Sequence, residues 1–253
     1  MIRMIKIELE KLFYSRRFYL SMAGVILGIP LTSLSLLPYS NHGTICSMFH
    51  SCSGEAFSLL VFLLCVVGGG VSFCMEQKSQ SIRYITLRGN ARDYAIGKIV
   101  SAFLGGYLIS LVGLVLGEFL LVIPLYMQQG NWNFLTSCVD QIGLDILTDV
   151  VYSFRYGILS VVAVLVSVFI PDVFIAMVAP IVIYYVYLNI TGWFACPSFF
   201  DITQMTSAVY YVDDFTSAQF WNDLEKAVCF SLTVVYIMSC AIIKKMKWRV
   251  EHG

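Results

Sequence analysis

Charged side chains are scarce in this sequence. Asp, Glu, Lys and Arg make up 13% of its 253 residues, against about 25% in a usual soluble domain. Hydrophobic residues make up 58%, and the mean hydropathy is +0.79. This composition excludes an ordinary soluble domain and predicts an integral membrane protein.

Basic residues are missing from three long segments. These segments are 38–56, 124–149 and 191–223, and they hold eight acidic residues. Of the 16 Lys and Arg residues, five lie in 3–17, five in 78–98 and four in 244–249. Lys and Arg in short loops stay on the cytoplasmic side of a membrane. We therefore expect both chain termini and residues 76–98 to be cytoplasmic, and the three segments without basic residues to lie outside.

Motifs for nucleotide, metal or nucleophilic chemistry are missing as well. The only Gly-Lys pair is Gly97-Lys98, and a phosphate-binding GxxxxGK[ST] loop would need different residues at Arg92 and Ile99. The sequence has no HExxH, GxSxG or CxxC pattern. The predicted spans also lack the carboxylate or histidine relay that proton-coupled transporters use. We therefore expect no enzyme activity, no metal and no bound cofactor in this chain, and no nucleic-acid partner.

The eight cysteines do not show whether the outer segments lie in an oxidising or a reducing compartment. Four of them, Cys46, Cys52, Cys138 and Cys196, fall in the predicted outer segments. Four cysteines allow three disulfide connectivities, with Cys46–Cys52 the simplest local pair. Disulfides and free thiols both remain open.

Long apolar runs are what the sequence has in abundance. They predict an all-α integral membrane protein with a single transmembrane domain over 1–253 and six helices long enough to cross a bilayer. The predicted spans are 18–37, 57–75, 99–123, 150–170, 173–190 and 224–243. Two features inside them bear on packing: Gly68-Gly69-Gly70 permits a close helix approach or a local break, and Gly113 and Gly117 form a GxxxG pair. Between the fourth and fifth spans, Pro171-Asp172 predicts a tight turn.

Residues 1–17 predict an amphipathic helix ahead of the first span. Ile2, Ile5, Leu9, Leu12 and Phe13 recur at helical spacing, with basic and acidic residues between them. Such a helix lies flat in the membrane interface. A cleaved signal peptide is not expected, because the basic region is long and contains two glutamates.

The basic segment 76–98 stands between the second and third spans. Asn90 predicts an N-cap, Ala91 to Lys98 predicts a fresh helix start, and Asp93 falls in its first turn. A basic helix start at the cytoplasmic face suits docking to a soluble partner. The alternative is a loop that only sets the topology.

Two charged residues lie inside apolar runs, both near the predicted outer ends of their spans. Glu118 and Arg155 form an ion pair at the mouth of a pathway, or each reaches the outer interface separately. The aromatic-rich segment 191–223 similarly has two interpretations: it dips into the bilayer as a re-entrant segment, or it lies on the headgroups.

Taken together, these features resemble the ABC-2 type permeases, the membrane subunits of bacterial ABC exporters whose ATPase is a separate polypeptide. The resemblance is carried by the basic amphipathic start, the six spans, the long outer segment after the fifth span, and a local run. That run begins at Glu76, continues through LRGNAR at 87–92 and ends at Gly97-Lys98. In the family, an acidic residue ends the second span, a short coupling helix follows, and Gly-Lys opens the third.

The resemblance implies a permease subunit that exports an amphipathic peptide, lipid-like or drug-like substrate, with immunity to antimicrobial peptides among the implied roles. It implies a multi-pass protein of the bacterial plasma membrane, with membrane lipids around it, a second permease subunit as a homo- or heterodimer, and a cytoplasmic ABC ATPase that binds ATP and Mg. The implied ATPase-coupling residues are Glu76, Arg83, Arg88, Arg92, Asp93 and Lys98. Two alternatives remain: a secondary transporter or channel, and a membrane sensor or enzyme component without an ATPase.

Overall fold

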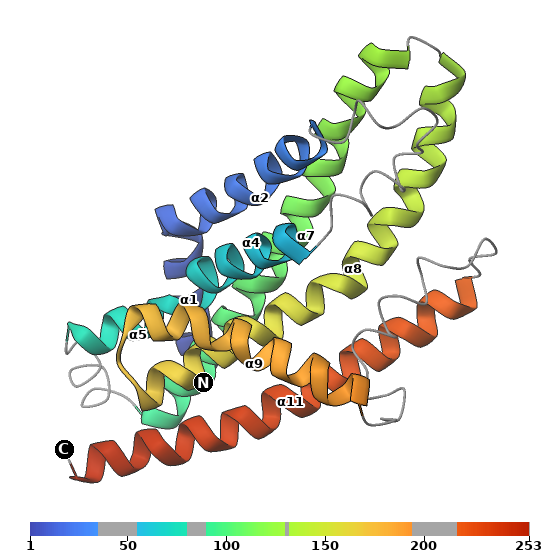
Figure 1. Cartoon of the computed structure of the whole chain (residues 1–253). Helices are drawn as coiled ribbons and strands as arrows, with labels where there is room; N and C mark the ends of the chain where they lie inside the picture. Colours follow the sequence, from blue (N-terminus) through green and yellow to red (C-terminus); the bar gives the residue numbers. More distant parts are fainter. Residues whose placement is uncertain (35–54, 80–89, 130–131, 194–216, 253) are drawn as a thin grey trace.

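The structure, a computed structural model, describes residues 1–34, 55–79, 90–129, 132–193 and 217–252. Within these ranges the chain is helical and has no strand (Figure 1). The helices are α1 (Ile2–Tyr14), α2 (Arg16–Leu34), α4 (Glu55–Cys65), the π-helical turn η2 (Val66–Gly70), α5 (Val71–Lys78), α7 (Ala91–Gln129), α8 (Trp132–Phe169), α9 (Val173–Trp193) and α11 (Ser217–His252). The predicted all-α class is thus confirmed for the described part of the chain.

Five stretches among the described residues are long and apolar enough to cross a membrane. They are Phe57–Lys78, Ala91–Leu120, Ile146–Phe169, Val173–Thr191 and Phe220–Met246. They correspond to the second through sixth predicted spans and indicate a multi-pass membrane protein. The first predicted span falls on α2, whose 19 described residues begin with two arginines and which is not among the five. A sixth crossing by α2, and the side on which the termini lie, stay predictions.

Two long helices, α7 and α8, form the central hairpin of the bundle. They have 39 and 38 residues, which is about 58 and 57 Å at 1.5 Å per residue. Both are therefore much longer than the roughly 30 Å hydrocarbon core of a bilayer. Their connected ends extend beyond the other helices at the upper right of Figure 1. Helix α8 is also the most buried candidate span, whereas few residues of α9 and α11 are buried.

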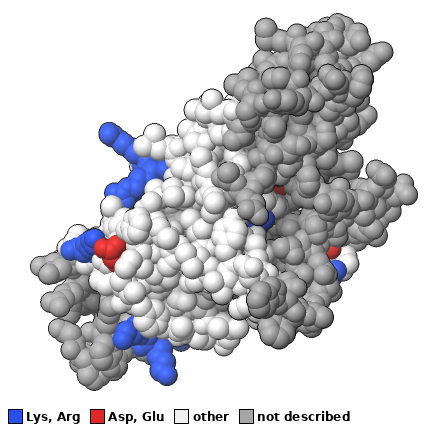
Figure 2. All heavy atoms as spheres, in the orientation of Figure 1, with Lys and Arg blue, Asp and Glu red and all other residues white. Residues whose placement is uncertain are grey.

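The two chain ends lie at the opposite end of the bundle from this hairpin connection (Figure 1). The start of α7 and the turn between α8 and α9 lie there too, and we call this the inner end, because its basic residues predict a cytoplasmic location. The turn confirms the prediction for Pro171-Asp172: the Asp172 carboxylate accepts hydrogen bonds from the backbone N–H groups of Phe174 and Ile175, at 2.8 and 3.1 Å, and so caps α9. On the face shown in Figure 2, Lys and Arg gather mainly toward this end, and most of the remaining described surface is neither acidic nor basic.

Glycines allow the second span to pass between α7 and α8 at very short range. A Cβ atom on Gly69 would lie 2.9 Å from the carbonyl oxygen of Ala102 on α7, and one on Gly70 would lie 2.8 Å from the carbonyl oxygen of Ser160 on α8. Where α7 and α8 cross each other, a Cβ on Gly106 would lie 2.6 Å from the carbonyl oxygen of Tyr156. The sequence left a close approach and a local break open for the glycine run, and the structure has both. Residues 66–70 form a π-helical turn in which the N–H of Val71 donates to the carbonyl of Val66, five residues back.

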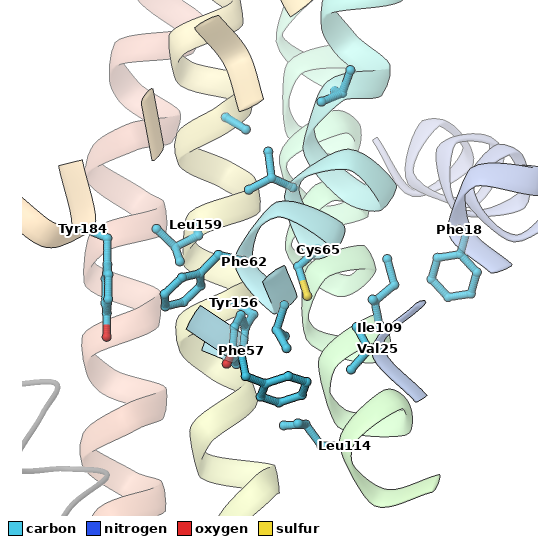
Figure 3. Close-up of a cluster of buried hydrophobic side chains, with 14 of the residues drawn as sticks. Phe18, Val25, Phe57, Phe62, Cys65, Ile109, Leu114, Tyr156, Leu159 and Tyr184 are labelled. Carbon is cyan, nitrogen blue, oxygen red and sulfur yellow. The ribbon is translucent and has the colours of Figure 1, made fainter. Parts of the chain in front are cut away.

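Helix α2 packs along the outer half of α7 through the predicted GxxxG pair. A Cβ atom on Gly113 would lie 2.7 Å from Val25, and one on Gly117 would lie still closer to Ile29, so the packing role of this pair is confirmed. The main apolar core lies beside this contact and is drawn in Figure 3, where Phe62 stands between the rings of Tyr156 and Tyr184.

Candidate functional site at the inner end of the bundle

Helix α1 does not stand apart from the bundle but lies along the first turns of α7. The N-terminal ammonium group is 2.9 Å from the carboxylate of Asp93. Farther along, a Cβ on Gly97 would lie 3.3 Å from the carbonyl oxygen of Met4, and one on Gly105 would lie 3.1 Å from Leu12. The two helices therefore run in the same direction. The missing side chain of Gly97 lets the two backbones come close, and that of Gly105 makes room for the Leu12 side chain.

The buried face of α1 carries an acidic residue at its centre. Met4, Glu8 and Leu12 follow each other at four-residue spacing and so share one face of the helix. Glu8 and Leu12 are buried, at 2% and 7% exposure. A carboxylate in this position must be matched by a cation, because an isolated buried charge is very costly.

Lys98 supplies that cation and joins three helices. Its Nζ atom is 2.8 Å from Oε2 of Glu8 on α1 and 2.8 Å from Oε1 of Glu76 on α5. The lysine itself comes from the second turn of α7 and is 2% exposed. One buried ammonium group thus holds two carboxylates that lie far apart in the chain.

Two further side chains complete this network. Lys11 lies 2.6 Å from Oε1 of Glu8 and 3.7 Å from Oε1 of Glu76, at the more exposed edge. The hydroxyl of Tyr94, which is fully buried, donates to the other oxygen of Glu76. We call these five residues the inner network: two carboxylates, two ammonium groups and one phenol, with no net charge.

Electrostatics in the inner network favour the charged forms of its residues on α1. Burial alone would raise the pKa of Glu8, but Lys98 and Lys11 outweigh it and hold the pKa below the ordinary value of 4.5. Burial alone would lower the pKa of Lys11, and its carboxylate neighbours Glu8 and Glu76 instead raise it above 10.5. Both residues are therefore ionised throughout the physiological pH range.

Among the described residues, the structure brings together only two of those that the resemblance implies for coupling to the ATPase. Glu76 and Lys98 are brought into direct contact, as described above. Asp93 pairs with the chain N-terminus, and Arg92 is exposed at the start of α7, where its N–H donates to the Asn90 side chain at 3.0 Å and confirms the predicted N-cap. Residues 91–98 are the first two turns of α7 rather than a separate helix. Arg83 and Arg88 lie outside the described residues.

Sequence reasoning missed Glu8 as a site residue. In the sequence, Glu8 served only as evidence against a signal peptide. The signal that could have identified it is its register with Met4 and Leu12, which puts it among the apolar positions of α1. Lys11 and Tyr94 were also missed, and their spacing alone gives no comparable signal.

Comparison of this chain with protein-family models, curated proteins and solved structures gave no match. The function therefore has to be inferred from the arrangement of its own residues. Among the described residues, no group of three or more His, Cys, Asp or Glu side chains could hold a metal ion. What the inner network offers chemically is a charge-neutral junction of three helices at the inner end of the bundle.

A second polar region lies in the outer half of the bundle. The guanidinium group of Arg155 is 3.1 Å from the ring centroid of Tyr152, and it donates to the hydroxyls of Tyr156 at 2.9 Å and Tyr184 at 3.4 Å. These contacts connect α8 to α9 through aromatic side chains. Pairing of Arg155 with Glu118 stays a prediction.

Two carboxylates are buried at similar depth in this outer region. Glu118 is 0% and Asp149 is 1% exposed, and both fall within candidate spans. Helices α7 and α8 cross where Gly106 meets Ser160. At 1.5 Å per residue, Glu118 lies about 18 Å outward from this point along α7, and Asp149 about 17 Å outward along α8. The sequence predicted Glu118 near the outer end of the third span but no relay of carboxylates, because Asp149 was assigned to the outer segment 124–149. The candidate span on α8 begins at Ile146 and includes it.

Proposed function

We propose that this chain is the membrane subunit of an ATP-driven exporter of the ABC-2 kind. The observation that carries the proposal is the contact among Glu76, Lys98 and Glu8. The resemblance singled out an acidic residue at the end of the second span and the Gly-Lys pair that opens the third. In this chain they are Glu76 and Lys98, which are 22 positions apart and in direct contact. Lys98 also binds Glu8 of the N-terminal helix.

A junction of this kind suits the transmission of force from a partner. The chain has no phosphate-binding loop, so ATP and Mg would be bound by a separate cytoplasmic ATPase. Movement of that ATPase against residues 76–98 would act on α7 directly, on α5 through Glu76, and on α1 through Glu8. A second permease subunit, identical or related, would complete the pathway for an amphipathic peptide, lipid-like or drug-like substrate.

Docking of the ATPase is the testable step. Reversing two charges in the basic segment, Arg88→Glu with Arg92→Glu, should leave membrane insertion intact, because Lys78, Arg83 and Lys98 still mark the segment as cytoplasmic. Each reversed charge should meet like charges on the partner, and the loss of one member of a desolvated charge pair costs about 2–5 kcal/mol. The measurement is the amount of ABC ATPase that co-purifies with the tagged chain from its native membrane.

Lys244→Glu with Lys245→Glu is the matched control, since it reverses two charges at the same end of the bundle but outside the coupling segment. We expect the control to retain the ATPase and the coupling variant to lose most of it. Equal retention by both variants would mean that Arg88 and Arg92 only set the topology.

A second candidate function is favoured by the buried carboxylates Glu118 and Asp149. Ionisable residues inside a membrane protein mark proton or ion pathways in many secondary transporters. Transport that depends on a proton gradient, needs no ATPase and is abolished by Glu118→Gln would favour this alternative. Transport that continues in de-energised vesicles supplied with ATP would exclude it.

A further inference from the structure

The chain bends sharply between α1 and α2, and the bend is held rigidly. Ser15 is extended, with φ −77° and ψ 122°, and it is closed on both sides by backbone hydrogen bonds: its N–H donates to Leu12 at 3.0 Å, and its carbonyl accepts from Phe18 at 3.1 Å. Phe18 is buried and makes edge-to-face contacts with Phe13 and with Tyr19, at centroid distances of 5.6 and 5.4 Å. Phe18 thus fixes one aromatic ring on each side of the corner.

The corner forms an open hollow of about 520 Å³ on the protein surface. The side chains that line it are Glu10, Phe13, Tyr14, Arg16 and Tyr19. They combine one anion, one cation and three aromatic rings. Glu10 also lies 4.0 Å from Lys6, in an exposed contact one helical turn back, which is a weak interaction. Its carboxylate can therefore turn toward a ligand at little cost.

An apolar stripe leads away from this hollow along α2. Leu20, Leu27 and Leu31 are 71%, 57% and 67% exposed, and their spacing puts them on one side of the helix. From Arg16 to Leu31 the helix rises about 22 Å, which is more than one leaflet of a hydrocarbon core about 30 Å thick. An apolar chain starting at the hollow would therefore find a continuous surface to lie against.

We propose that the hollow binds the headgroup of a phospholipid that carries both a phosphate and a primary ammonium, the chemistry of phosphatidylethanolamine. Arg16 binds the phosphate with its planar set of donors, and Glu10 accepts from the ammonium. Phe13, Tyr14 and Tyr19 surround the glycerol region, as aromatic side chains do at membrane interfaces. The acyl chains follow the exposed stripe on α2. This site is independent of the exporter proposal and requires only that α2 enters a membrane.

The two opposite charges in the hollow distinguish this headgroup from purely anionic ones. A headgroup with a phosphate but no ammonium would satisfy Arg16 but would offer Glu10 no cation to offset the phosphate charge. General attraction to anionic lipids, by contrast, would involve every exposed arginine of the corner equally. Arg17 is adjacent to Arg16 and equally basic, but it does not line the hollow.

The test compares Arg16→Gln with Arg17→Gln in the full chain, purified in detergent and stripped of lipid. Native mass spectrometry measures the bound fraction of added phosphatidylethanolamine and phosphatidylglycerol. Arg16→Gln should weaken phosphatidylethanolamine binding about fivefold, the factor given by roughly 1 kcal/mol, while Arg17→Gln leaves it unchanged. Equal effects of the two variants, or no effect of either, would overturn the site.

A third variant tests the choice of headgroup. Glu10→Gln should retain phosphate binding but lose the preference for phosphatidylethanolamine over phosphatidylglycerol. A preserved preference would overturn the assignment of the ammonium to Glu10. Soluble phosphoethanolamine should compete poorly because it lacks acyl chains, and efficient competition would show that the hollow recognises a free phosphate compound rather than a lipid. All variants are expected to unfold at the temperature of the lipid-free wild type, since the altered side chains are exposed.

Discussion

Glu8 is the residue on which the position of α1 depends. Only this residue and Leu12 are buried on α1, so apolar burial alone fixes the helix weakly. A buried ion pair adds little net stability compared with apolar packing, but removal of one partner is costly because the other charge stays buried. Glu8 and Lys98 therefore specify where α1 docks more than they stabilise the fold.

This role predicts a pH-dependent effect of Glu8→Gln. Near pH 7 the variant leaves Lys98 with Glu76 as its remaining carboxylate and should lose about 1–3 kcal/mol of stability, seen as a lower thermal midpoint in detergent. Because the folded pKa of Glu8 lies below 4.5, its contribution is fully present above pH 4.5 and is lost as the pH falls through the folded value. The difference between wild type and variant should therefore shrink in acid.

Glu10→Gln is the control for this prediction, since Glu10 lies on the exposed side of the same helix and forms a 4.0 Å surface contact. It should change the thermal midpoint little at any pH. A Glu8→Gln variant as stable as Glu10→Gln at pH 7 would show that α1 is held by other contacts.

At the scale of single residues, the sequence predicted the inner network in part. Glu76 and Lys98 were identified through the resemblance, and the cap at Asn90 followed from residue type and spacing. Glu8 was missed because its partner is 90 positions away, and no local pattern reports a contact at that distance. Arg155 was expected to meet a carboxylate or the outer interface, and the tyrosine rings and hydroxyls that it contacts were not foreseen, because Tyr184 comes from another helix.

At the scale of elements, the π-helical turn sets which side chain of the second span reaches the inner network. A π turn accommodates one extra residue, and each residue of an α-helix adds a rotation of about 100°. Without the turn, Met75 rather than Glu76 would face Lys98 and Tyr94. The turn is supported by Ser160, whose hydroxyl donates to the carbonyl of Cys65 at 3.1 Å. The sequence showed the glycine run, but it could not show which of two backbone geometries the neighbouring helices would stabilise.

Gly106 tests whether α7 and α8 cross as tightly as the structure indicates. A Cβ added there would lie 2.6 Å from the carbonyl oxygen of Tyr156 and closer still to Oγ of Ser160, so helix α8 itself would have to move. Gly106→Ala should therefore lower the free energy of unfolding by about 1–3 kcal/mol, measured by thermal or denaturant unfolding in detergent.

Gly24→Ala is a suitable control, because its Cβ would meet only the flexible end of Leu64 at 2.9 Å. This variant should unfold close to the wild type. If Gly106→Ala proved as stable as Gly24→Ala, the close approach of α7 to α8 would be contradicted.

At the scale of the whole molecule, composition was enough to predict a helical membrane protein, because apolar runs of this length are typical of helices that cross a bilayer. Span boundaries were less predictable. Helices α7 and α8 continue well past the bilayer thickness, so hydropathy alone does not show where a crossing ends. The orientation, the dimer and the ATPase partner rest on charge distribution and resemblance, and they remain predictions.

The most direct test of the proposed exporter function is ATP hydrolysis by the complex purified through a tag on this chain. We expect vanadate-sensitive hydrolysis by the preparation from native membranes, and none after the partner subunit has been removed and this chain re-isolated alone. Hydrolysis should return when the partner is added back. Hydrolysis by the isolated chain, or a preparation from native membranes that carries no ATPase, would contradict the proposed function.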